Sequence, residues 1–86
     1  MPAISRFYGI AIFMYWRDHS PPHYHAIYGE HEAIFLVEDG SLLYGSLPRR
    51  ALRFVQTWHR LHPDELLEAW GRAQAGLAVG TIEPLP

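Results

Sequence analysis

Cysteine and lysine are both absent from this chain of 86 residues. Without cysteine there is no disulfide and no thiolate ligand for zinc, so any bound metal would depend on histidine and carboxylate side chains. The sequence also lacks a glycine-rich phosphate loop, a nucleophile elbow and a catalytic carboxylate pair. These absences exclude the common nucleotide-binding and hydrolase motifs, and no cofactor is expected.

The start of the chain lacks the charged segment and apolar run of a signal peptide. Its longest apolar stretch, residues 10–16, is far too short to span a bilayer. We therefore expect a cytoplasmic protein without a membrane partner. The formal net charge of −2 argues against a protein held on DNA by bulk electrostatic attraction.

The sequence has enough apolar residues, 49% of the chain, to build the core of one domain. Apolar and β-branched runs in the first half predict strands at residues 10–16, 24–28, 32–38 and 42–44. Gly29-Glu30 fits a two-residue hairpin turn, which would place Tyr28 opposite His31.

The second half of the chain predicts two helices. Pro48 and Pro63 each fit the first turn of a helix, where a missing N–H costs nothing, and Gly76 fits the left-handed residue that ends the second helix. Spacings of three and four give each helix one buried stripe. The stripes are Ala51, Phe54, Val55, Trp58 and Leu61 in the first helix, and Leu66, Leu67, Trp70 and Ala73 in the second.

Together these elements predict an α+β fold, an antiparallel β-meander of three to four strands followed by two helices packed on one face. The expected single domain covers residues 1–86. Its parts are the β-meander at residues 1–46, the helix pair at residues 47–76, and a C-terminal tail or short strand at residues 77–86.

Three of the six histidines fall in the segment DHSPPHYH, residues 18–25. Residues two apart on a strand share a face, so His23 and His25 would project side by side. Asp18 and His19 could approach them across the two prolines, as a further ligand or as a supporting carboxylate.

The expected hairpin register places Glu32 on the face of His23 and His25, nearest Ile27, and His31 on the opposite face. No complete set of three metal ligands emerges from this register. Three interpretations of the histidines stay open: a metal site, acid–base or RNA-contacting groups, or a rigid turn whose histidines bond backbone carbonyls. Residue chemistry alone favours the rigid turn.

Arginines recur along the first predicted helix. Arg49, Arg53 and Arg60 share one face, and Arg50 lies beside them. This face could clamp phosphate or carboxylate groups, or it could be the solvated side of an amphipathic helix. Glu65 and Glu68 of the second helix are candidate partners for these arginines.

Several segments together carry a family resemblance: ISRFYGI, DHSPPHYHAIYGEHEA, LPRRALRFV, HPDELLEAW and IEPL. In this order, and over nearly the whole chain, they resemble the bacterial domain of unknown function 4160. Tyr24 stands where phenylalanine is common in that family, and Phe13 where many relatives have a polar or basic residue. The family's motif positions in this chain are His19, Pro21, Pro22, His23, His25, His31, Glu32, Arg49, Arg50 and Trp70.

The resemblance implies one half of a two-gene toxin–antitoxin module, with this family as the toxin-like partner. It implies a cognate small protein, encoded next to it, as binding partner. The histidine cluster and the arginine face make RNA a further candidate partner. The alternatives are a non-catalytic protein-interaction module and a small histidine-ligated metal protein.

Two sets of candidate site residues follow from the histidine cluster and the arginine face. We expect any chemistry to be metal-independent RNA cleavage or RNA binding, with a histidine as proton carrier and an arginine on phosphate. The candidate catalytic residues are His23, His25 and His31. The candidate binding residues are His19, Glu32, Arg49, Arg50 and Arg53.

Overall fold

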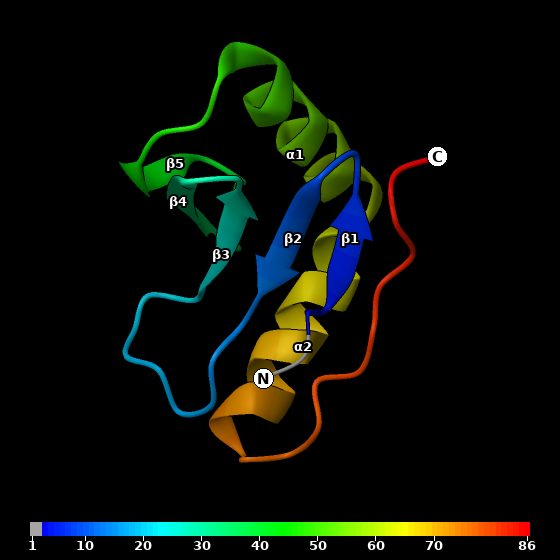
Figure 1. Ribbon diagram of the computed structural model, residues 1–86. Coiled ribbons are helices and arrows are strands. Elements are labelled where there is room, and N and C mark those ends of the chain that lie inside the picture. Colours follow the sequence, from blue (N-terminus) through cyan, green and yellow to red (C-terminus); the bar gives the residue numbers. More distant parts are fainter. Residues whose placement is uncertain (1–2) are drawn as a thin grey trace.

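The computed structural model describes residues 3–86 as a five-stranded antiparallel sheet followed by two helices (Figure 1). Met1 and Pro2 of the expected domain lie outside the described residues. The α+β class is confirmed, with five strands instead of three to four. The strands lie across the sheet in chain order: β1 (Ser5–Phe7), β2 (Ile10–Phe13), β3 (His23–Tyr28), β4 (His31–Leu36) and β5 (Leu42–Gly45).

The first strand, β1, is the element that the sequence did not predict. It pairs with β2 through a tight turn at Tyr8 and Gly9, both of which have positive φ, 51° and 82°. Two positive φ angles in succession characterise the hairpin turn that glycine favours. Gly9 was therefore the available signal, but three residues are too few to show a strand periodicity.

The apolar run at residues 10–16 forms a strand only as far as Phe13. Met14 is fully buried, whereas Tyr15 and Trp16 are exposed, to 40% and 51%, in the loop that follows. The expectation of a strand reaching Trp16 was wrong. A run of apolar residues does not by itself distinguish a strand from a loop whose apolar side chains pack against the rest of the protein.

Two helices, α1 (Arg49–Leu61) and α2 (Pro63–Gln74), begin directly after Pro48 and at Pro63. Gly76 has φ 72° and follows the end of α2, as expected. The buried residues are Ala51, Val55, Trp58 and His59 in α1, and Leu66, Ala69, Trp70 and Ala73 in α2.

Two expected core leucines are instead exposed: Leu61 to 55% and Leu67 to 58%. The buried face of α1 continues from Val55 through His59, which lies one turn further on, and leaves Leu61 at its margin. Histidine thus takes a core position that the sequence pattern assigned to leucine.

The core lies between the helices and one face of the sheet, the inner face. Tyr24 and His59 form a polar pair inside it: the Tyr24 hydroxyl donates to His59 Nδ1 at 2.8 Å, and the imidazole also bonds the Val37 backbone. Burial lowers the pKa of His59 below its usual 6.5, although the Val37 bond and the charge of Asp39 act in the opposite direction. Burial also raises the pKa of Tyr24.

The C-terminal residues 77–86 run beside β1 (Figure 1), but no strand is assigned there. Ile82 N–H donates to the Ile4 carbonyl at 2.8 Å, and the Trp58 indole N–H donates to the Glu83 carbonyl at 2.9 Å. The tail therefore covers the β1 edge of the sheet. Within the described residues, neither helix has the length and apolar character needed to cross a membrane.

The His59 environment predicts acid sensitivity of the fold. Because the folded-state pKa is lowered, the unfolded chain binds the proton more readily, and the free energy of unfolding should fall as the pH drops below about 6.5. Urea denaturation at a series of pH values from about 8 to about 5 measures this slope. His59→Gln cannot take up the proton and should flatten it, so equal slopes in the two proteins would contradict the assignment.

Candidate functional site

Side chains on β3 alternate between the two faces of the sheet. Tyr24 and Ala26 enter the core, so His23 and His25 lie on the opposite, outer face. The hairpin register is the one the sequence predicted, with His25 opposite Ile34, Ile27 opposite Glu32 and Tyr28 opposite His31.

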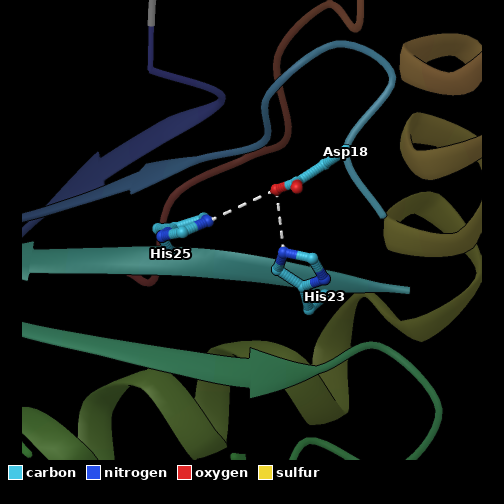
Figure 2. A group of neighbouring side chains, drawn as sticks. All are labelled: Asp18, His23 and His25. Atoms are coloured by element: carbon cyan, nitrogen blue, oxygen red, sulfur yellow. Dashed lines mark hydrogen bonds and ion pairs between the residues drawn. The ribbon is translucent and has the colours of Figure 1, made fainter. Parts of the chain in front are cut away.

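The loop at residues 14–22 folds over the two outer-face histidines and brings Asp18 to them (Figure 2). Asp18 Oδ2 lies 2.9 Å from His23 Nε2 and 3.7 Å from His25 Nε2. The His23 side chain is only 6% exposed and that of His25 only 13%. We call Asp18, His23 and His25 the Asp–His–His cluster.

The C-terminal end of α2 holds this loop in place. Arg17 N–H donates to the Ala73 carbonyl at 3.1 Å, and the Gln74 side-chain amide donates to the Asp18 carbonyl at 2.8 Å. The His23 ring packs on Trp70, with ring centroids 5.2 Å apart. The cluster is thus fixed by residues about fifty positions further along the chain.

Asp18 is held as a carboxylate. Its burial acts to raise the pKa, but hydrogen bonds from the His19 backbone N–H and from His23, together with the charges of His23 and His19, outweigh burial and lower the pKa below 3.8. Asp18 is therefore ionised at neutral pH.

His25 has one bonded and one free ring nitrogen. Its Nδ1 lies 3.1 Å from Glu32 Oε2, and its ring meets Tyr15 edge-on with centroids 4.6 Å apart. Its Nε2 is buried and has no hydrogen-bond partner among the described residues. Glu32 pairs with Ile27 in the register, yet its side chain reaches diagonally to His25.

The remaining candidate histidines lie in two different places. His19 adjoins the cluster, with Nδ1 3.0 Å from Asp18 Oδ1 and a side chain that is 90% exposed. His31 is exposed and stacks on Tyr28 at 6.4 Å, on the other face of the sheet from His23 and His25. The structure therefore does not bring the three candidate catalytic histidines together.

The candidate arginines lie on α1, which covers the inner face of the sheet, and so do not share a surface with the cluster. Arg49, Arg50 and Arg53 are exposed. Arg50 lies over the Phe54 ring and lines a pocket of about 260 Å³, together with Tyr8, Tyr28, Pro48, Ala51 and Phe54. Glu65 and Glu68 pair with His62 and Arg72, not with the arginines of α1.

Sequence reasoning missed Gln74 and the contact between Trp70 and His23, because nothing in the local sequence relates the end of α2 to the loop. It also missed His59. The spacing of four from Val55 was an available signal for His59, since it places the imidazole on the buried stripe of α1.

A comparison with known protein families shows which family the chain belongs to. Residues 9–71 match the family described as a domain of unknown function, DUF4160. The chain belongs to this family. The DUF4160 match includes Asp18, His23, His25 and Glu32, and therefore the whole cluster with the carboxylate that supports it. No curated protein and no solved structure matches the chain.

The support of the DUF4160 cluster by the end of α2 predicts opposite effects for two glycines. Gly76 has φ 72°, a conformation that is strained for alanine, so Gly76→Ala should destabilise the fold by about 1–3 kcal/mol. The added Cβ would lie 2.5 Å from Arg17 Nη2 and should displace that guanidinium. Gly71 lies inside α2, and a Cβ added there would meet nothing within 4 Å, so Gly71→Ala should stabilise the fold by about 0.5–1 kcal/mol. Urea denaturation measures both changes.

Hydrogen exchange locates the effect of the Gly76→Ala change. Amide protection in residues 14–22 should fall in Gly76→Ala and stay unchanged in Gly71→Ala. Unaltered protection of that loop in Gly76→Ala would show that displacement of the Arg17 guanidinium does not loosen the loop.

Proposed function

We propose that this protein is the toxin-like component of a bacterial two-gene toxin–antitoxin module and that a small protein encoded beside it binds and neutralises it. The family resemblance implies this role, and a cytoplasmic location accords with it. The observation that carries the proposal is an open sheet edge suited to a partner strand.

The two edges of the sheet differ. The β1 edge is covered by the tail through the Ile82–Ile4 hydrogen bond. At the other edge, all residues of β5 are exposed, including Leu42 at 43%, Leu43 at 49% and Tyr44 at 74%. An uncharged apolar edge strand is a template for pairing with another chain. We assign this edge to the cognate small protein.

An RNA-directed activity is a second part of the proposal, and the exposed groups around the cluster support it. Asp18 is positioned to orient the His19 imidazole through Nδ1, leaving the other ring nitrogen toward solvent as a proton carrier. Tyr15 and Trp16, exposed in the same loop, offer rings on which bases stack. The arginines of α1 lie too far round the molecule to share this role.

Controlled expression in a bacterial host tests the toxin role. Expression of this chain alone should arrest growth, and co-expression of the neighbouring gene should restore it. His19→Ala should weaken the arrest if a proton carrier is needed, whereas His31→Ala, an exposed histidine on the other face, should not. Unimpaired growth on expression alone would remove the toxin role, and intact cellular RNA during arrest would remove the RNA-directed part.

The open β5 edge predicts where the partner binds. Leu43→Lys places a charge on the edge strand and should weaken binding of the cognate protein at least about tenfold, because lysine opposes strand addition. Leu67→Lys alters a similarly exposed leucine on α2 and serves as the matched control. Calorimetric titration gives both dissociation constants; equal values would place the interface elsewhere.

A further inference from the structure

Both histidines of the Asp–His–His cluster have Nδ1 engaged in the same way. His23 Nδ1 lies 2.7 Å from the Pro21 carbonyl oxygen, and His25 Nδ1 lies 3.1 Å from Glu32 Oε2. A carbonyl oxygen and a carboxylate oxygen only accept hydrogen bonds, so Nδ1 is the donor in each ring. In the neutral form of each imidazole, the lone pair is therefore on Nε2.

The two Nε2 atoms converge on one carboxylate oxygen, Asp18 Oδ2 (Figure 2). Each of the three residues offers one ligand atom that lies within 4.8 Å of those of the other two. With both imidazoles neutral, these three atoms are all acceptors in a largely buried space, and their repulsion is relieved either by a metal ion between them or by a proton on His23 Nε2 that is donated to Asp18. The Nε2 atom of His25 is buried and has no hydrogen-bond partner in residues 3–86, so its lone pair is unsatisfied.

We propose that Asp18, His23 and His25 bind one divalent transition-metal ion of the zinc class. Two ligands placed about 2.1 Å from a tetrahedral ion lie about 3.4 Å apart. The distances from Asp18 Oδ2 to the two Nε2 atoms, 2.9 and 3.7 Å, bracket that value. Two imidazoles with one carboxylate favour zinc, nickel, cobalt or iron over magnesium and calcium, which prefer oxygen ligands alone.

The surroundings of the three ligands match those of metal-bound histidines. Such histidines donate their second ring N–H to a backbone carbonyl or a carboxylate, which fixes the ring and its tautomer. Pro21 and Glu32 supply these two acceptors, and His19 lies against the other oxygen of Asp18. Asp18 and Glu32 also contribute two negative charges, and among the described residues neither forms an ion pair with an arginine.

Anchoring of the loop prepares the site for the ion. The hydrogen bonds from Gln74 and Arg17 fix Asp18 against the end of α2, so little of the chain has to become ordered on binding. Three protein ligands leave at least one coordination position for water or another small ligand. The inference rests on these three side chains alone and is independent of the toxin role.

Metal analysis and titration with Zn²⁺ test the proposal. Protein purified without a histidine tag and without chelator should carry about one equivalent of transition metal, and chelator-treated protein should bind about one Zn²⁺ in calorimetry. Zn²⁺ should also raise the melting temperature of the wild-type chain.

Ligand variants localise the binding. His25→Ala and Asp18→Asn should each weaken Zn²⁺ binding at least about tenfold, and Glu32→Ala by about 10–100-fold through loss of the His25 support. His31→Ala, which removes an exposed histidine from the opposite face, should leave the affinity unchanged. Circular dichroism of each metal-free variant checks that it is folded.

Two results would overturn the proposal. One is less than about a tenth of an equivalent of metal in the native protein together with no saturable Zn²⁺ binding afterwards. The other is equal Zn²⁺ affinity in the wild type and folded His25→Ala, which would place the ion elsewhere. A chain that binds Zn²⁺ as described but leaves growth untouched would uphold the metal site and remove the toxin role.

Discussion

The alternation of side chains along β3 is the constraint on which both halves of the structure depend. Its inward residue Tyr24 bonds His59 within the core, while its outward residues His23 and His25 meet Asp18 under the loop. A slip of one residue would exchange the two sets, placing two imidazoles in the apolar core and a tyrosine outside. Core packing therefore also fixes the face on which the cluster forms.

The cluster is formed by parts of the chain that are far apart in sequence. β3 contributes the imidazoles, the loop contributes Asp18, and the end of α2 holds that loop through Gln74 and through Trp70 against His23. Local opening of the loop would remove the carboxylate without disturbing β3. The geometry of the cluster thus depends on the packing of α2, although none of the three cluster residues lies on that helix.

The two faces and two edges of the sheet have different surroundings. Its inner face is closed by two helices, and its β1 edge is covered by the C-terminal tail. Its outer face carries the Asp–His–His cluster, and its β5 edge remains open. A partner strand at β5 and a ligand at the cluster would therefore occupy different surfaces of the same sheet, so the two can be altered separately.

The sequence by itself determined features that depend on neighbours along the chain: the shared face of His23 and His25, the turn at Gly29, and the helix end at Gly76. It did not reveal the short β1, or that the run at residues 10–16 turns into a loop after Phe13. Only the tertiary structure decided that Asp18 meets both histidines and that His59 enters the core. Those contacts join residues from different elements. The spacing of residues along the chain does not show which elements will pack together.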